Sequence, residues 1–415
     1  MAAASPEAGA LADIKVLDLS RVLAGPWCTQ ILADLGADVV KVELPQAGDD
    51  TRHWGPPFLQ DEEGRDTDQA SYFASCNRNK RSVTIDMSKP EGQALIRQLA
   101  EQADVLVENF KVGGLRKYGL DHASLSALNP RLVYCSVTGF GQTGPYAERA
   151  GYDLLVQASS GMMSITGRAD GEPGGGGVRV GVALTDLFTG VYASTAILAA
   201  LRARDATGRG QHIDMALLDV GMAILANQAS GYLNTGQVPQ RQGNTHPSLA
   251  PYQDFPTADG AMLLAIGNDG QFARFCEAAG KPEWASDPRF VRNTARVQHR
   301  GVLIPAMEDV TRTRSTADWI ALLEDKAVPC GPINDMRQAF EDPQVQARGL
   351  RIDMPRAAGD GIAHIAGVAS PLRLSEHPAV LRHAPPALGE HTVQVLQELG
   401  LSAERIAELQ EARIV

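Results

Sequence analysis

The stretch Gly181–Gly190, with the sequence GVALTDLFTG, places a single carboxylate in an apolar segment bounded by glycines. Asp186 lies among leucines and has no basic residue within six positions on either side. A carboxylate in this setting can attack an activated acyl group, and the glycines let backbone approach a ligand. It can also cap the helix predicted for residues 186–202, which is the more common use of an aspartate before an apolar helix. This stretch alone leaves both interpretations open.

The five cysteines are far apart in the sequence, odd in number and without a CxxC pair. This pattern is typical of reduced thiols in a cytosolic protein and predicts neither disulfides nor a zinc site. A buried cysteine more often packs as a small apolar residue than acts as a nucleophile. We therefore expect no metal ion and a cytoplasmic location.

The 415 residues carry a formal net charge of -11, with 21% charged and 44% hydrophobic residues. This composition predicts a soluble globular protein with two domains, or with one large and one small domain. An acidic chain lacks the dense basic face that nucleic acids require, so we expect no nucleic-acid partner. No apolar run in the sequence approaches about 18 residues, and the N-terminus lacks a signal-peptide pattern, so we expect no membrane partner.

The elements that must position Asp186 begin with a strand–helix–strand pattern at residues 14–20, 27–35 and 39–43. Strand-like and helical segments then keep alternating, and a helix is predicted at 90–102. This alternation predicts an α/β domain with a mostly parallel sheet, in which the loop after the first strand faces a ligand crevice. That loop has no GxGxxG, so the usual dinucleotide fingerprint is absent.

The second half of the chain has a different composition. We expect a helix at 215–233, a long loop at 238–257 and a strand at 261–266, followed by shorter helices with charged faces. A final helix is predicted at 392–411. The shift in composition predicts a smaller second domain in this half.

A set of short motifs, taken in order, resembles the class III CoA-transferases, a family that includes formyl-CoA transferase, carnitine CoA-transferase and the α-methylacyl-CoA racemases. The resemblance covers nearly the whole chain, and so many motifs in one order are more specific than any motif alone. They are VLDLSRVLAGP at 16–26, LGADVVKVE at 35–43, GDDTR at 48–52, NRNKRS at 77–82, VENF at 107–110, GFGQTGP at 139–145, GYD at 151–153 and TGRGQ at 207–211.

The family resemblance implies an α/β fold with a large Rossmann-like domain, built from both chain ends, and a smaller α+β domain. The large CoA-binding domain would take residues 1–224, the small domain 225–335, and a linker with the completing part of the large domain 336–415. Members of the family form interlocked homodimers whose chains thread each other. The resemblance also implies acyl-CoA and small carboxylic acids as substrates, without a permanently bound cofactor.

Local runs resemble the branch of the family that transfers CoA from succinyl-CoA to dicarboxylates such as glutarate. These runs are DDTRHWGPP at 49–57, SCNRNK at 75–80, VGVALTD at 180–186, PYQ at 251–253 and PCGPIN at 329–334. The second carboxylate of such an acceptor requires a cation or amide donors. The candidates are Arg52, Arg78, Arg179, Asn244 and His246.

Asp186 falls where the family has its catalytic aspartate. By the resemblance, its carboxylate attacks the donor thioester to give an acyl-aspartyl anhydride and CoA thiolate. The thiolate returns to give an aspartyl-CoA thioester and the free acid, and the acceptor acid then repeats the sequence in reverse. Backbone N–H groups near Gly181 or Gly190 are candidates to stabilise the oxyanion that develops at the carbonyl.

CoA carries a 3′-phosphoadenosine diphosphate, so its site needs lysine, arginine and glycine backbone. The resemblance indicates residues from the first loop, the basic cluster at 77–80, the segment after residue 108 and the turn at 149–153. This CoA-binding set is Val22, Leu23, Ala24, Asn77, Arg78, Asn79, Lys80, Asn109, Phe110, Lys111, Lys117, Arg149, Tyr152 and Asp153. Taken singly, each charge is typical of an ordinary solvated residue.

Tyr152 separates two activities within the family. The racemases have a histidine in a Gly-His-Asp triplet as one of two bases, whereas this chain has Gly151-Tyr152-Asp153. A tyrosine, with a pKa of about 10, is a poor base near neutral pH, so racemisation is disfavoured but stays an alternative. A CoA-binding protein without catalysis and a nicotinamide-dependent dehydrogenase also remain open, the latter weakened by the missing fingerprint.

Overall fold

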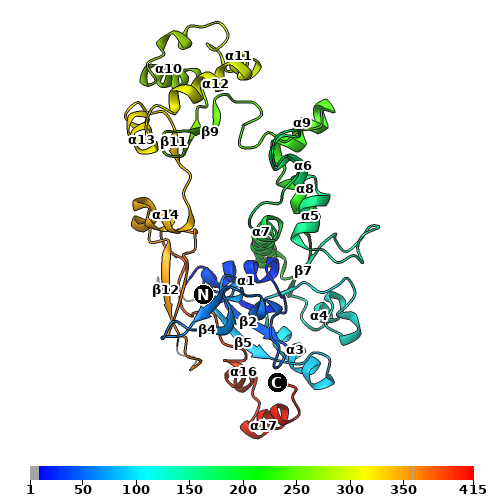
Figure 1. Cartoon of the computed structure of the whole chain (residues 1–415). Coiled ribbons are helices and arrows are strands. Elements are labelled where there is room, and N and C mark those ends of the chain that lie inside the picture. The colour runs from blue at the N-terminus through cyan, green and yellow to red at the C-terminus, as the bar shows by residue number, and fades with distance from the viewer. Residues whose placement is uncertain (1–8, 357–358) are drawn as a thin grey trace. The chain divides into compact units, whose positions relative to one another are not determined.

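A parallel sheet of six strands organises the first of two units into which the chain divides (Figure 1). The computed structural model describes residues 9–356 and 359–415. The strand order reverses between β1 and β6, which is the doubly wound arrangement whose ligands bind beyond the carboxyl ends of the strands at the reversal. In spatial order the strands are β5 (Lys80–Thr84), β2 (Asp38–Glu43), β1 (Lys15–Asp18), β6 (Val105–Glu108), β7 (Val133–Thr138) and β8 (His212–Ala216).

Both faces of the sheet are covered, because successive strand residues point to opposite sides and apolar strand residues occur on both. One face, with Val16 and Val105, packs on α1 (Ala24–Asp34) and α7 (Leu184–Thr207), which lie against each other in Figure 1. The other face, with Leu17, packs on a second set of helices. These are α3 (Pro90–Gln102), α4 (His122–Leu128), α16 (Thr392–Glu398) and α17 (Ala403–Glu411).

Helix α7 has 24 residues and is long and apolar enough to cross a membrane by length and composition alone. The expectation that no apolar run approaches about 18 residues is therefore wrong for this segment. Less than half of its most apolar stretch is buried, and core helices of globular proteins meet the same criterion. The helix contacts α1, β7 and β8 within the first unit.

Two hairpins and several short helices complete the first unit. Two antiparallel hairpins are formed by β3 (Phe58–Gln60) with β4 (Asp66–Ala70), and by β12 (Arg351–Pro355) with β13 (His364–Val368). The helical elements are η1 (Asp50–His53), α2 (Ser71–Ala74), η2 (Arg116–Tyr118), α5 (Asp153–Ser159) and α8 (Leu217–Ala223), while α6 (Met162–Ile165) and α9 (Ala226–Thr235) span the division between the units.

The second unit comprises Met163–Arg179 and Gly231–Val345. Its sheet is antiparallel, and its core contains Phe255, Phe272 and Trp319. The strands are β11 (Cys330–Pro332), β10 (Ala261–Ala265) and β9 (Tyr252–Pro256), in that order. The helices are α10 (Asp269–Ala278), η3 (Pro282–Ala285), α11 (Asn293–Gln298), α12 (Arg300–Thr311), α13 (Thr316–Asp325) and α14 (Met336–Glu341), and α15 (Pro343–Ala347) continues into the first unit.

The mixed α/β fold with a parallel central sheet confirms the main structural prediction. The helix expected at 215–233 is wrong in its first part, because 212–216 forms the edge strand β8 and two short helices follow. The loop expected at 238–257 ends in strand β9. The helix expected at 392–411 is interrupted near Gly400, which has a left-handed φ of 87° that glycine adopts without strain.

Helix α3 offers a direct test of the core assignment. Ile96 is fully buried between the helix and the sheet, whereas Gln98 on the same helix is exposed. We expect Ile96→Ala to lower the free energy of unfolding by about 2–5 kcal/mol, because it leaves a cavity. Gln98→Ala should change it by less than about 0.5 kcal/mol. Urea-induced unfolding measures both, and equal midpoints for the two variants would show that Ile96 is not a core residue.

Candidate active site

Asp186 is the third residue of α7, which begins at Leu184 with Ala183 as its N-cap. Helix α7 precedes the parallel strand β8, so its N-terminus lies at the carboxyl edge of the sheet. In the part of the chain that the structure describes, the Asp186 side chain has no hydrogen bond or ion pair. The first turn is instead capped by Asp153, whose Oδ1 accepts the Thr185 backbone N–H at 2.9 Å and its hydroxyl at 2.6 Å.

These contacts distinguish the two interpretations of Asp186. The capping interpretation is not supported, because another aspartate caps the helix and Asp186 caps nothing. Asp153 itself is fixed by Gln157, whose amide donates to its second oxygen at 2.7 Å. Gln157 also accepts the backbone N–H of Val180 at 2.9 Å, which ties the segment before α7 to α5.

The charge state of Asp186 follows from this environment. Burial first, and then the negative charge of Asp153, raise the pKa of Asp186 to about 7. The charge of Asp186 in turn acts on Tyr72 of α2. Burial first, and then this charge, raise the pKa of Tyr72 to about 12. Asp186 is therefore a carboxylate of raised basicity that can become an anion near neutral pH.

The loop between β1 and α1 meets the loop after β6 at the reversal in strand order. The Arg21 backbone N–H donates to Asn109 Oδ1 at 2.9 Å, and the Asn109 amide donates to Arg21 O at 2.7 Å. Leu23 and Ala24 are buried, and Val22 is partly buried. The structure thus brings together the first-loop part of the predicted CoA-binding set and Asn109.

Phe110 follows Asn109 and is partly buried, with its backbone N–H donating to Glu108 at 2.8 Å. Burial raises the pKa of Glu108 to about 7 despite this bond and one from a serine. The Arg21 guanidinium lies 5.4 Å from the centre of the Phe110 ring. Lys111 is exposed on the same loop. This edge of the reversal therefore offers an aromatic ring with two flanking cations.

The remaining exposed cations of the predicted set lie on other loops. Lys117 is exposed in η2, with its ammonium 4.6 Å from the centre of the Tyr118 ring. Arg149 is exposed and stacks on the ring of Tyr146 at 3.7 Å. Tyr152 is 61% exposed. Whether these three residues contact CoA stays a prediction.

The side chains of the basic cluster at 77–80 do not lie open to a ligand, and the structure does not support them as direct CoA contacts. Arg78 forms a bidentate pair with Asp34, with N–O distances of 2.9 and 2.6 Å. Lys80 is fully buried and lies 3.1 Å from Asp18. The two asparagines of the cluster also donate to backbone oxygens. Buried charges need such partners, so these residues bind the protein itself.

Arg52 is also committed to partners inside the protein. It is 6% exposed and donates to both oxygens of Glu43 at 2.7 Å. Its guanidinium stacks on Phe73 at 3.6 Å and donates to Pro386 O. Arg52 is therefore not supported as the cation for a distal substrate carboxylate.

The other three residues predicted for the substrate belong to the second unit. Arg179 is exposed, and Asn244 donates to Asp254 at 3.1 Å. His246 lies beside Tyr252, with 5.2 Å between the ring centres. Their grouping with Asp186 stays a prediction.

The glycines around Asp186 have different surroundings. A Cβ at Gly190 would lie 2.8 Å from Ala24 O and 2.9 Å from Trp27, so this glycine allows α7 to approach the start of α1. Its close packing does not support Gly190 as an oxyanion donor. Gly181 is exposed, and a Cβ there would meet open space. One turn beyond Asp186, α7 thus touches the helix that follows the first loop.

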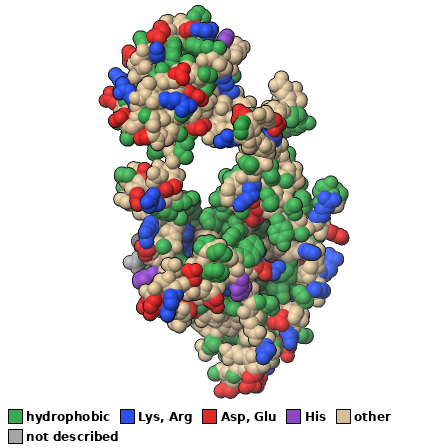
Figure 2. All heavy atoms as spheres, in the orientation of Figure 1, with side chains coloured by type: hydrophobic (Ala, Val, Ile, Leu, Met, Phe, Trp, Pro, Cys, Tyr) green, Lys and Arg blue, Asp and Glu red, His purple; other side chains and the backbone are tan. Residues whose placement is uncertain are grey.

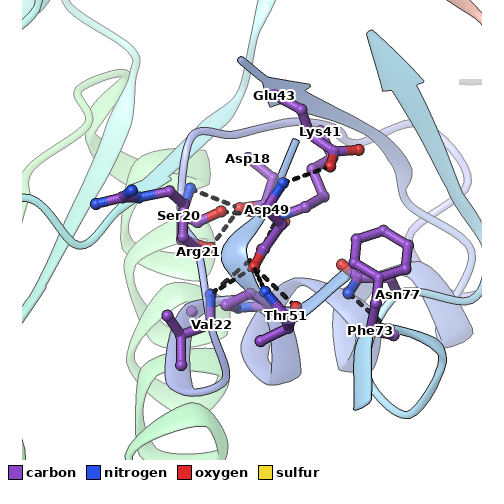
Figure 3. A network of polar contacts seen from close by, with 12 residues as sticks. Asp18, Ser20, Arg21, Val22, Lys41, Glu43, Asp49, Thr51, Phe73 and Asn77 are labelled. Atoms are coloured by element: carbon purple, nitrogen blue, oxygen red, sulfur yellow. Dashed lines mark hydrogen bonds and ion pairs between the residues drawn. The ribbon is translucent and has the colours of Figure 1, made fainter. Parts of the chain in front are cut away.

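A buried charged network beneath the first loop was not predicted (Figure 3). Its centre is the ion pair between Lys41 and Asp49, both fully buried. Its sequence signal is weak: Lys41 is a lone cation inside an apolar strand, and GDDTR was noted only as a motif. Within residues 9–356 and 359–415 no group of three or more His, Cys, Asp or Glu side chains is arranged to hold a metal ion.

Comparison with known proteins places the chain in a family. The profile of CoA-transferase family III matches residues 11–392. The chain belongs to this family, as its motifs indicated, and it is an enzyme of the CoA-transferase class.

Three relatives illustrate the similarity. The chain is 52% identical to succinate–glutarate CoA-transferase of Agrobacterium fabrum, over 94% of this chain and 95% of that protein. It is 41% identical to human succinyl-CoA:glutarate CoA-transferase, over 98% of this chain and 90% of that protein. The crystal structure of a CaiB/BaiF family protein from Brucella suis superimposes with a TM-score of 0.84 at 48% identity, covering 95% of this chain and 100% of that one.

The raised pKa of Asp186 can be measured directly. We expect the ¹³Cγ resonance of Asp186, assigned by its loss in Asp186→Asn, to titrate with a pKa of about 7. Asp153→Asn keeps an oxygen for the Thr185 N–H but removes the negative charge, so the pKa of Asp186 should fall. A pKa near 4 in the unmodified protein would contradict this description of the site.

Proposed function

We propose that the protein transfers CoA from succinyl-CoA to a dicarboxylic acid, with glutarate as the first candidate, through covalent intermediates on Asp186. The observation that carries this proposal is an unpaired carboxylate in the first turn of α7, at the carboxyl edge of the sheet. One turn later the same helix touches the start of α1, which follows the proposed CoA loop. The nucleophile Asp186 and the loop proposed to bind the CoA of the donor thus lie at the same carboxyl edge of the sheet.

The proposed reaction balances without any other reactant. The Asp186 carboxylate attacks the succinyl thioester carbonyl, the C–S bond breaks, and an aspartyl–succinyl anhydride and CoA thiolate result. The thiolate attacks the aspartyl carbonyl, which releases succinate and leaves an aspartyl-CoA thioester. The acceptor carboxylate attacks this thioester to give a second anhydride, and the thiolate then attacks the acceptor carbonyl. The product is acceptor-CoA, and the Asp186 carboxylate is restored.

The environment of Asp186 suits a nucleophile. Only the anion attacks a carbonyl, and a pKa of about 7 leaves a substantial anionic fraction at neutral pH. The same shift makes the anion more basic than an exposed aspartate. The backbone dipoles at the N-terminus of α7 favour negative charge in the first turn and so act against the shift. The carboxylate also has no ion pair to break before it reacts.

For CoA we propose a site that is smaller than the predicted set. The backbone of Val22, Leu23 and Ala24, with Asn109 and Phe110, forms its inner part at the strand reversal. The exposed cations Lys111, Lys117 and Arg149 are proposed to meet the phosphates. The buried cluster at 77–80 is proposed to hold this site in place through contacts such as that of Lys80 with Pro26 O, without contacting CoA.

The choice of succinate and glutarate is supported by the activities for which the two relatives are named, at 52% and 41% identity over nearly full length. The distal carboxylate of glutarate needs a cation or amide donors. With Arg52 occupied by Glu43, we propose Arg179, Asn244 and His246 for this role. The cytoplasm is the proposed location, and the five free cysteines suit a reducing compartment.

A homodimer, interlocked as in the family, is also proposed. Hydrophobic side chains gather on the face of the first unit that Figure 2 shows, and on α7 Phe188, Val191 and Tyr192 are each more than 40% exposed. Such apolar surface favours a protein partner. We expect mass photometry to find twice the chain mass of 44.2 kDa. A species of 44.2 kDa alone would contradict the dimer.

The enzymatic proposal is tested by mixing the protein with succinyl-CoA and each acid of a panel that includes glutarate, and by detecting acyl-CoA products by mass spectrometry. We expect glutaryl-CoA from the native protein. Asp186→Asn, which keeps the size of the side chain, should lower kcat by more than about 10³-fold, because the nucleophile is lost. Asp153→Asn, which keeps the nucleophile but removes the charge that raises its pKa, shows separately what this neighbouring carboxylate contributes.

Trapping shows whether the route is covalent. Hydroxylamine added to the protein with succinyl-CoA should convert Asp186 to a hydroxamate, which peptide mass spectrometry locates. Transfer that persists in Asp186→Asn would refute the nucleophile. Exchange of an α-proton for deuterium, without CoA transfer to any acid, would favour a racemase instead.

A further inference from the structure

The ion pair between Lys41 and Asp49 contacts the loop that joins β1 to α1 (Figure 3). Neither side chain is exposed, and Lys41 Nζ lies 2.9 Å from Asp49 Oδ2. The same Nζ donates to Ser20 O at 2.8 Å. The pair therefore holds the loop at Ser20, its second residue.

Val22, two residues further along, has a left-handed backbone with φ of 71°. A β-branched residue adopts this conformation only where its surroundings impose it. Both oxygens of Asp49 accept the Val22 N–H at 3.2 Å, and the Val22 carbonyl accepts the Cys76 thiol at 3.7 Å. Side chains from elsewhere in the chain thus hold both polar backbone groups of Val22.

The chemistry of Asp49 explains why a carboxylate stands here. It also accepts the backbone N–H of Thr51 at 3.0 Å and its hydroxyl at 2.8 Å. With Val22 and Lys41, four donors converge on two oxygens, which an ionised carboxylate accommodates and an amide does not. Although burial acts to raise it, Lys41 and Thr51 lower the pKa of Asp49 to about 2. The group therefore stays ionised at neutral pH.

A second pair keeps Asp49 itself in place. The Asp49 backbone N–H donates to Glu43 Oε2 at 2.9 Å, and Glu43 is held by the bidentate contact from Arg52. Buried ion pairs can often be replaced by apolar residues without loss of stability. A contribution to stability alone therefore does not explain why two buried ion pairs lie next to one strained loop.

We propose that Lys41 and Asp49 are positioning residues for CoA, which hold Val22 in its left-handed conformation and so direct the backbone of residues 22–24 toward the ligand. The proposal rests on the proposed function in one respect, that this loop receives CoA. Neither side chain reaches the ligand. Their effect is on the shape of the loop before CoA arrives.

The test compares Asp49→Asn and Lys41→Met with the native protein. Both should raise the Kd for CoA and the KM for succinyl-CoA by at least about tenfold, because the receiving backbone is displaced. The KM for the acid and kcat should each change by less than about threefold, because Asp186 and the acid site are untouched. Hydrogen–deuterium exchange at the Val22 amide should become faster in both variants.

Arg204→Met is the matched control for a general loss of stability. Arg204 is 5% exposed and pairs with Asp104 at 2.9 Å, at the amino ends of the strands and far from the loop. We expect this variant to lower Tm as the other two do, but to leave the Kd for CoA within about twofold.

A rescue experiment isolates the conformation of Val22. Glycine adopts a φ of 71° without strain, so it needs less help from Asp49. Asp49→Asn should therefore raise the Kd for CoA less when residue 22 is glycine than when it is valine. We expect the two fold-increases to differ by a factor of at least about three. If Asp49→Asn alone fails to fold, the Kd for CoA can still be compared between Val22→Gly and the double variant Val22→Gly with Asp49→Asn.

The outcomes are distinct. If Arg204→Met weakens CoA binding as much as Asp49→Asn, or if Val22→Gly relieves nothing, the ion pair is only structural and the proposal is wrong. If kcat falls while the Kd for CoA is unchanged, the proposal is equally wrong. If the native protein binds CoA but transfers it to no acid, the proposed function fails, while the binding and exchange measurements still decide the role of the pair.

Discussion

The geometry of the site depends on the parallel pairing of the central strands. Parallel neighbours cannot be joined by a tight turn, so the chain must cross over between them, usually as a helix. Every strand then ends at one edge, and every crossover helix begins there. Asp186 is at this edge because α7 precedes β8, and Asn109 is there because it follows β6. Residues more than 70 positions apart are thereby placed at the same edge without a dedicated motif.

The alternation of strands and helices could be predicted because long apolar segments with clear stops are the strongest local signal. Helix α3 begins at Pro90 and ends at Gln102, as predicted. Strand β8 could not be predicted, because this edge strand is followed at once by helix α8. Its alternation of polar and apolar residues merges with the apolar pattern of the helix. The length of the apolar segment in α7 was missed for a related reason. Polar residues are scattered through this helix and interrupt every apolar run, although its mean hydropathy is high.

Charged residues were predicted less well than apolar ones. Arg52, Arg78 and Lys80 look like ligands in the sequence because nothing local shows their partners. Their partners Glu43, Asp34 and Asp18 lie 9 to 62 positions away. The role of Asp153 was hidden in the same way, since it caps α7 from 32 positions upstream. Pairing at a distance is a property of the fold, and one sequence does not display it.

The second face of the sheet is completed by α16 and α17, whose buried residues Leu396 and Leu409 join the core that contains Val83. During synthesis, at roughly 5–20 residues per second, the strands of the sheet wait on the order of tens of seconds for the segment that covers them. The second unit is finished before that moment, since its last residue is Val345. The unit that carries Asp186 is therefore the last to be completed, and its strands need protection from other nascent chains until then.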